Sequence, residues 1–244
     1  MWFAVEGDLR FLSHHETMGT LERCAVRAKL PLRYSQGFNP HPVMSLVLPR
    51  PVGVAGTDEL LALALDYPDS PASADSDEAR GDRLIAELQR QVPAGMTLLR
   101  ARRVTSRSVR AKRIDCRLPM EPADLPALAA RLAELQTLEQ WLAERLTSPK
   151  RHRPGEPMKK IQIDVKPLTS NLRIEGSDLC WSALPRGESW ARPGEVLRLL
   201  GLEERINLAR VVRTAVEYEF GPAPAPACAD DGGPAEPAVG DEGT

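Results

Sequence analysis

The chain has 244 residues, of which 42% are apolar, and a formal net charge of −2. This length allows one large domain or two small ones, each with a buried core. No run approaches the roughly 18 consecutive apolar residues of a membrane-spanning helix, and the N-terminus lacks the basic start and apolar core of a secretory signal. We therefore expect a cytoplasmic protein that does not enter a membrane.

Apolar residues at strand and helix spacing predict the elements of the first half of the chain. In chain order we predict a strand at 1–5, a helix at 14–28, strands at 31–35, 43–49 and 58–67, a surface loop at 68–82, a helix through Leu84 and Leu88 to Gln91, and a strand at 96–104. This order is similar to that of a ferredoxin-like α+β sandwich with one added strand.

The second half of the chain repeats this order loosely. We predict a strand at 113–118, helical segments in two pieces at 124–146, strands at 161–168, 171–176 and 178–184, a helix between Pro193 and Gly201, and a strand at 209–219. The predicted fold class is therefore α+β, with two ferredoxin-like units in tandem at residues 1–106 and 107–218. Residues 219–244 are rich in Pro, Ala, Gly and acidic residues, and we predict that this acidic tail is disordered.

Charge is distributed unevenly along the chain. The tail at 219–244 holds six acidic and no basic residues, so the remaining residues carry +4, because −2 minus −6 is +4. Among these, Arg100–Arg117 contains eight Lys or Arg with one acid, and Arg145–Lys160 contains six with one acid. Such clusters favour a polyanionic partner, because they release the counterions condensed on phosphates. The alternative is that these side chains are merely solvated on exposed elements.

The cysteines indicate no cofactor. Cys24, Cys116, Cys180 and Cys228 are 92, 64 and 48 residues apart, which fits neither a metal site nor the framework of a small disulfide-bonded domain. An iron–sulfur cluster held by three closely spaced cysteines is excluded for the same reason. We predict reduced, mostly structural thiols.

The sequence SHHE at 13–16 predicts the start of a helix. Ser13 can accept a hydrogen bond from the backbone N–H of Glu16, and Glu16 from that of Ser13, which makes a capping box. His14 and His15 then lie in the first turn, where the helix dipole favours a neutral imidazole that can accept a proton. Anion binding at this helix end is an alternative that the charge of Glu16 opposes, and purely structural histidines are another.

The sequence YSQGFNPHP at 34–42 predicts a stiff loop. Gly37 tolerates a positive φ, whereas Pro40 and Pro42 fix their own φ and extend the residues before them. A loop that is rigid before a ligand arrives loses less entropy on binding. Phe38 offers a ring for stacking on a base, Asn39 an amide edge and His41 an imidazole. The alternative is a structural turn in which Phe38 fills the core and Asn39 bonds its own backbone.

The pattern RFLSH…ERCAVRAKLPLRYSQGFNPHPVMSLVLPRPVGV, dense from Phe11 to Gly53, resembles the N-terminal signature of a bacterial radical-SAM-associated domain of unknown function. Segments 159–168 and 210–219 are similar to later parts of that family, so the resemblance extends over residues 1–218. The family usually has Leu-Asp after Ser-His and then an arginine, whereas this chain has His15, Glu16 and Gly19. The resemblance implies association with a radical SAM protein and, by gene neighbourhood, with an RNA-processing ribonuclease of the E/G class. It also implies a functional role for Ser13, His14, Gly37, Phe38, Asn39, Pro40 and His41.

Two hypotheses of function follow. The first is a non-catalytic accessory protein that binds RNA, such as tRNA or rRNA, for a radical SAM modification enzyme. We expect the stiff loop and the capped histidine turn to share one face of the molecule, beside the cations that contact phosphates, namely Arg102, Arg103, Arg107, Lys112 and Arg113, with further cations from the stretch at 145–160.

The second hypothesis is a metal-independent RNA-processing enzyme in which His14 and His41 act as acid and base, which requires the two rings to converge. A metal site made of His14, His15, His41 and Glu16 is disfavoured, because adjacent helical residues point about 100° apart.

Overall fold

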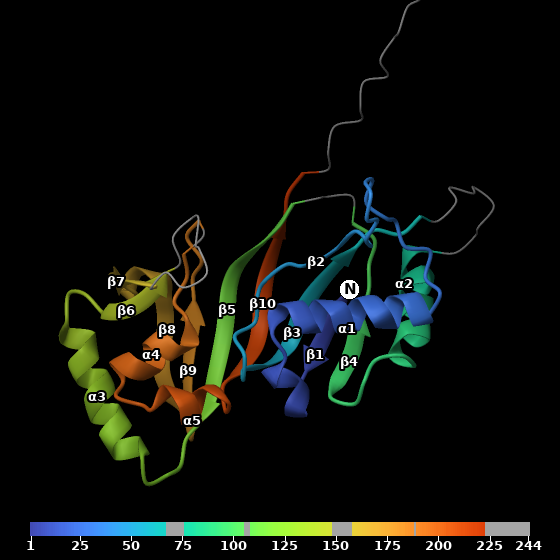
Figure 1. Cartoon of the computed structure of the whole chain (residues 1–244). Helices are drawn as coiled ribbons and strands as arrows, with labels where there is room; N and C mark the ends of the chain where they lie inside the picture. The colour runs from blue at the N-terminus through green and yellow to red at the C-terminus, as the bar shows by residue number, and fades with distance from the viewer. Residues whose placement is uncertain (67–75, 105–107, 148–157, 188, 223–244) are drawn as a thin grey trace, which may run out of the picture.

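The computed structural model confirms an α+β fold (Figure 1). It describes residues 1–66, 76–104, 108–147, 158–187 and 189–222. Within these ranges the helices are α1 (His14–Arg27), α2 (Asp77–Gln89), α3 (Leu125–Thr137), α4 (Pro193–Leu199) and α5 (Glu204–Leu208), with short 3-10 helices η1 (Gly7–Phe11) and η2 (Lys166–Leu168). None of the helices in the described part of the chain is long and apolar enough to cross a membrane.

Ten strands form the two sheets of the described residues. They are β1 (Trp2–Val5), β2 (Met44–Leu46), β3 (Ala55–Leu63), β4 (Met96–Arg100), β5 (Val109–Pro119), β6 (Leu142–Thr147), β7 (Lys159–Asp164), β8 (Thr169–Glu175), β9 (Asp178–Ala183) and β10 (Val212–Phe220). The larger sheet has the order β4-β1-β3-β10-β5-β9-β8, with β2 paired to β3, and β6 and β7 make a separate two-stranded sheet.

The two halves of the chain contribute equivalent sets of strands to one mixed sheet. The first half gives the order β4-β1-β3-β2, and the second gives β10-β5-β9-β8, so in both the last strand lies beside the first. The pairs within each half are antiparallel, whereas β3 and β10, which join the halves, are parallel at residues 55–56 and 212–213. The predicted boundary between 106 and 107 falls outside the described residues.

Each half has its own hydrophobic core. In the first half, Phe3 of β1 packs with Leu21 of α1 and Leu84 of α2. In the second half, Ile114 of β5 and Trp181 of β9 pack with Leu132 of α3. Alternation along β5 explains its placement, since Ile114, Cys116 and Leu118 are buried and the residues between them are not.

Several predicted boundaries differ from the structure. Helix α2 begins at Asp77, inside the predicted loop, because the Ser76 side chain accepts from the Ala79 N–H and the acidic residues of the first turn suit the helix dipole. Residues 142–147 form strand β6 and not a second helical piece, since they pair with β7. The predicted strand at 31–35 forms only isolated bridges, and the strand predicted at 96–104 ends at Arg100.

The end of the chain also differs from the prediction. Strand β10 continues to Phe220, so the first two residues of the predicted tail belong to the sheet. Residues 223–244, the remainder of that predicted tail, lie outside the described residues.

Candidate functional site

Arginine and aromatic side chains surround a pocket where the two halves of the sheet separate. Strands β3 and β10 pair only at 55–56 and 212–213, and β2 pairs with β3 further along. In the separated region a pocket of about 440 Å³ is lined by Trp2, Arg100, Ala101, Arg102, Val216, Tyr218 and Phe220. It therefore lies between β1 and β4 of the first half and β10 of the second, and ligand sites are common at the interface between two units of a fold.

Arg102, one of the predicted RNA-binding residues, lies against two aromatic rings in this pocket. Its guanidinium carbon is 5.2 Å from the centre of the Trp2 ring and 4.4 Å from that of Phe220. The two ring centres are 6.2 Å apart, with the ring planes inclined by 55°. Arg100 lies 4.6 Å from the Trp2 ring and is held by an ion pair with Asp58 at 2.9 Å. Both cations thus lie beside aromatic rings, and Arg100 is in addition held by its ion pair.

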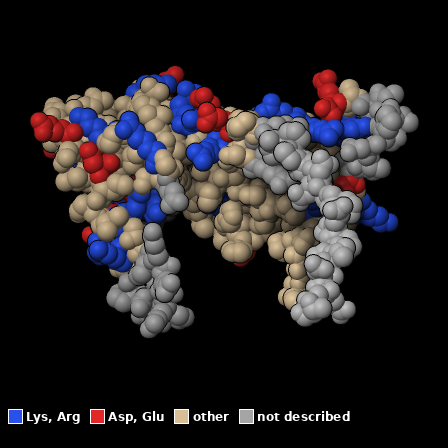
Figure 2. Space-filling model, turned by 90° about the horizontal axis from the view of Figure 1, so that it is seen from above, with Lys and Arg blue, Asp and Glu red and all other residues tan. Residues whose placement is uncertain are grey.

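The other predicted cations that the structure describes follow β4 or lie in the first half of β5, and two of these three have acidic partners. Arg103 is exposed and has no ion pair within the described residues. Lys112 pairs with Glu219 at 2.9 Å and Arg113 with Asp115 at 3.2 Å. Arg107 lies outside the described residues. Figure 2, which looks down on the end of the sheet that is uppermost in Figure 1, shows Lys and Arg side chains along one border, with Asp and Glu among them.

The first residue of the second basic stretch, Arg145, does not lie on the surface as predicted. Arg145 is only 6% exposed and is paired with Glu195, which is buried too. Lys160 is exposed but pairs with Glu144 at 2.9 Å. Residues 148–157, with the remaining predicted cations except Lys159, lie outside the described residues.

The loop YSQGFNPHP forms the tip of a narrow hairpin. Tyr34 and Pro42 make a bridge, and the Ser35 N–H donates to the His41 carbonyl at 2.8 Å. The Ser35 hydroxyl also accepts from the His41 N–H at 3.1 Å and contacts the His41 Nδ1 at 2.9 Å. Gly37 has a φ of 152°, in a region that favours glycine. These contacts orient the histidine ring from within the loop.

The residues of this tip are exposed. Phe38 is 106% exposed, which excludes the alternative in which its ring fills the core. Asn39, Pro40 and His41 are exposed as well. The Phe38 ring therefore has no packing role within the fold and is open to contact with another molecule.

The helix start at Ser13 is capped as predicted. The Ser13 hydroxyl accepts from the Glu16 N–H at 3.3 Å, and a Glu16 carboxylate oxygen accepts from the Ser13 N–H at 2.8 Å. The hydrogen bond that the Ser13 N–H donates to the carboxylate, with a smaller contribution from the Ser13 side chain, lowers the pKa of Glu16. His14 is half-buried and His15 exposed, with ring centres 6.4 Å apart in an edge-to-face arrangement. No group of potential metal ligands was found within the described residues.

We expect Ser13→Ala to lower the melting temperature by about 2–4 °C, since loss of such a cap costs about 1 kcal/mol. The pKa of Glu16 is depressed in the folded state, so its contribution is present above the unfolded pKa and is lost as the pH falls through the folded one. Ser13→Ala keeps the backbone N–H that is the larger cause of the lowered pKa, so only the smaller, side-chain part of the difference between the two proteins should be lost below about pH 4. Thermal unfolding at several pH values, with Ser45→Ala on β2 as a control, checks this; an unchanged melting temperature at neutral pH would argue against a contribution of the cap.

The capped turn and the hairpin tip lie at opposite ends of β3, contrary to expectation. Backbone contacts place the segment before Ser13 beside the start of β3, because the Gly53 N–H donates to the Arg10 carbonyl at 2.8 Å. The base of the hairpin is fixed beyond the end of β3, where the Arg33 N–H donates to the Ala64 carbonyl at 2.9 Å. The nine residues of β3 separate these points by about 30 Å. His14 and His41 therefore do not converge.

The hairpin tip instead shares an end of the sheet with the pocket. Trp2 is paired with Leu60 near the end of β3 and with Arg100 at the end of β4. In Figure 1 the chain between α1 and β2, which forms the hairpin, rises to the same upper end as β4 and β10. We call this end of the sheet, with Trp2, Arg100, Arg102, Phe220 and the tip residue Phe38, the aromatic–arginine end.

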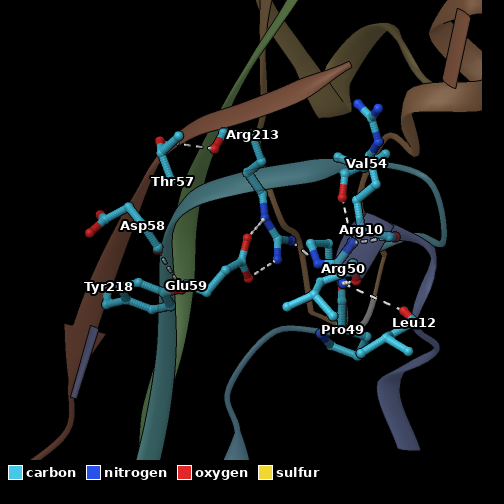
Figure 3. A network of polar contacts seen from close by, with 11 residues as sticks. Arg10, Leu12, Pro49, Arg50, Val54, Thr57, Asp58, Glu59, Arg213 and Tyr218 are labelled. Atoms are coloured by element: carbon cyan, nitrogen blue, oxygen red, sulfur yellow. Dashed lines mark hydrogen bonds and ion pairs between the residues drawn. The ribbon is translucent and has the colours of Figure 1, made fainter. Parts of the chain in front are cut away.

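A network of buried arginines explains why the turn before α1 lies where it does (Figure 3). Arg50 is 9% exposed and donates to the carbonyls of Arg10 at 2.7 Å, Leu9 at 3.3 Å, Leu12 at 3.5 Å and also Val54. This one side chain ties η1 and the start of α1 to the start of β3. Arg50, which belongs to the sequence pattern from Phe11 to Gly53, therefore has a structural role.

A buried ion pair between Glu59 and Arg213 joins the two halves beside this network (Figure 3). Arg213 donates from Nε to the Glu59 carboxylate at 2.8 Å and from Nη2 to its other oxygen, and the two side chains are 1% and 5% exposed. Burial lowers the pKa of Arg213, but the charge and hydrogen bonds of Glu59 outweigh burial and raise it above its ordinary value. This pair stabilises the parallel contact between β3 and β10.

Sequence reasoning missed the aromatic members of the pocket. Trp2 was assigned only to a strand, and Phe220 to the tail. The available signal was the alternation of Val216, Tyr218 and Phe220, which places their side chains on one face if the strand continues.

Comparison with known proteins gives a family without an assigned activity. Residues 1–204 match the model of a family described as an uncharacterized protein conserved in bacteria, DUF2344. The match covers most of the chain, and the chain therefore belongs to this family. No curated protein matches the chain.

Proposed function

We propose that this chain, as a member of the DUF2344 family, is a non-catalytic RNA-binding accessory protein whose binding surface is the aromatic–arginine end of the sheet. The observation that carries the proposal is the position of Arg102 against the rings of both Trp2 and Phe220, in a pocket of about 440 Å³ beside Arg100. Proteins that bind single nucleic-acid strands combine cations for the backbone with aromatic faces for the bases. Both kinds of group occur here together.

The available charges favour phosphate over a purely apolar ligand. Arg103 and Arg110 are exposed, and neither has an ion pair with another described residue. Arg102 touches the two aromatic rings and likewise has no acidic partner within the described ranges. Three guanidinium groups without a neutralising carboxylate retain their attraction for a polyanion.

We further propose that each half of the chain is a ferredoxin-like unit, which the shared strand order supports. We also propose a radical SAM protein as the enzyme served by this chain, and an E/G-class ribonuclease as a further partner, both in the cytoplasm; the resemblance of the Phe11–Gly53 pattern supports these partners. The separation of His14 and His41 gives no support to an acid–base enzyme.

The test is RNA binding by an Arg102→Gln/Arg103→Gln variant at several salt concentrations. Each phosphate contact that is lost should reduce the slope of log affinity against log salt by about 0.7 for a single strand. We expect a slope lower by about 1.4 and weaker binding to RNA of any sequence. The measurement is fluorescence anisotropy with a labelled RNA oligonucleotide.

The matched control is Arg90→Gln/Arg117→Gln, which removes the same charge from the other end of the sheet. Arg90 is exposed just after α2, before β4 begins, and Arg117 lies near the end of β5. The control should keep the original salt slope. Equal slopes for all three proteins, or no RNA binding by the unmodified protein, would refute the proposed surface.

A further inference from the structure

We infer that the pocket takes an unpaired nucleobase, so that the RNA bound at the aromatic–arginine end is single-stranded. This inference rests on the proposed function and names the class of RNA. Its first basis is the shape of the site: the pocket lies in the wedge where β10 leaves β3, and one of its lining side chains, Tyr218, is held by a hydrogen bond from its hydroxyl to the Asp58 carbonyl at 3.3 Å. A flat group can enter such a wedge from the open end.

The chemistry of the lining suits a base and its phosphate. Phe220 is partly exposed, and Arg102 lies 4.4 Å from its ring centre, which makes a flat surface of an aromatic ring and a guanidinium plane. Both groups stack on unpaired bases in proteins that bind RNA. Arg100, fixed by Asp58, is placed to receive the adjacent phosphate, because its side chain is still 56% exposed.

The two arginines differ in their freedom to respond to a ligand. Arg100 is anchored by its ion pair, whereas Arg102 lies against two aromatic rings and has no ion pair within the described residues. Arg102 can therefore stay stacked over an incoming base or turn to its phosphate without breaking an ion pair. Arg100 can therefore position the RNA backbone, while Arg102 can change its orientation when a base binds.

The hairpin tip supplies a second stacking surface at the same end. The ring of Phe38 is 106% exposed and projects from a loop that the Ser35–His41 contacts hold. In an A-form duplex the base faces are stacked on each other and unavailable, so neither Phe38 nor the Phe220 surface has a partner there. A single strand presents base faces to both surfaces.

The test compares one labelled 12-nucleotide RNA as a single strand and as a blunt duplex with its complement, under identical salt conditions. We expect the single strand to bind at least ten times more tightly. Phe220→Leu and Phe38→Leu should each weaken single-strand binding about 5- to 100-fold, the range for loss of one stacked base, and leave duplex binding unchanged. Phe38 is fully exposed, so its variant tests stacking without a risk to folding.

Phe11→Leu is the matched control, because Phe11 is 50% exposed and lies in η1, at the other end of β3. It should bind both RNAs as the unmodified protein does. Equal affinities for single strand and duplex, or unchanged single-strand binding by both phenylalanine variants, would overturn this inference. Neither result would change the effect of Arg102 and Arg103 on the salt dependence, so the proposed function would still stand. Absence of binding to either RNA would overturn both.

Discussion

Replacing Arg213 with methionine is expected to lower the free energy of unfolding by about 3–5 kcal/mol, the range for a buried ion pair that loses one partner. The variant leaves the Glu59 carboxylate 5% exposed, without the two hydrogen bonds that Arg213 donates. Because β3 and β10 pair directly at only two positions, loss of this contact weakens the junction between the two halves. Equilibrium unfolding in urea, followed by fluorescence, measures the effect.

Because Arg50 lies near this ion pair, we expect the variants of Glu59 and Arg213 to differ in stability. Burial lowers the pKa of Arg50, the carboxylate of Glu59 opposes that effect, and the charge of Arg213 adds to it. Glu59 therefore serves two guanidinium groups. Removing it leaves two buried cations near each other, whereas removing Arg213 leaves one carboxylate near one remaining cation. We expect Glu59→Met to destabilise the protein more than Arg213→Met does.

Two controls separate the ion pair from simple loss of packing. The double variant Glu59→Met/Arg213→Met should regain part of the stability lost in Glu59→Met alone, since apolar groups replace both charges. Arg33→Met breaks an exposed pair with Asp66 and should cost no more than about 1 kcal/mol. If Arg213→Met cost as little as Arg33→Met, the junction would not depend on this pair.

The local elements of the fold could be predicted because their causes lie close together in the chain. The capping box at Ser13 and Glu16 needs only four consecutive residues, and the structure confirms it. The buried alternation of β5 is likewise visible in the sequence. The start of α2 was misplaced although its cap is also local, because an Asp- and Ser-rich segment is typical of both loops and helix starts.

The features that depend on distant residues could not be predicted in this way. Arg145 was interpreted as a surface cation because its partner Glu195 follows 50 positions later. The joining of the halves depends on Glu59 and Arg213, which are 154 positions apart. Likewise Trp2 and Phe220, at the two ends of the described chain, gave no sign of forming one pocket.

These long-range contacts also decide which predicted site residues lie together. The hairpin tip and the capped turn both precede residue 43, and their closeness in the sequence suggested one surface. Strand β3 separates them, while it brings the hairpin to the end where β4 and β10 finish. Arg100, Arg102 and Arg103 therefore lie at the same end of the sheet as Phe38 and Phe220, and not beside His14.

The largest effect expected in the second half is the loss of stability in Arg145→Met, about 3–5 kcal/mol. Arg145 donates to both oxygens of Glu195, at 2.6 and 2.8 Å, and to the Trp190 carbonyl at 2.7 Å. Its removal leaves Glu195, at the start of α4, with a buried negative charge and only the Arg192 N–H at 2.9 Å as a partner of its carboxylate among these contacts.

Lys160→Met on the same two-stranded sheet is the matched control, because its pair with Glu144 is exposed. The control should change the free energy of unfolding by no more than about 1 kcal/mol. Unfolding in urea measures the stability of each variant, and fluorescence anisotropy under native conditions measures its RNA affinity. Arg145→Met should unfold at a lower urea concentration, yet bind RNA normally while it is folded. Weaker RNA binding by the folded variant would mean that the 145–160 stretch contributes to the interface after all.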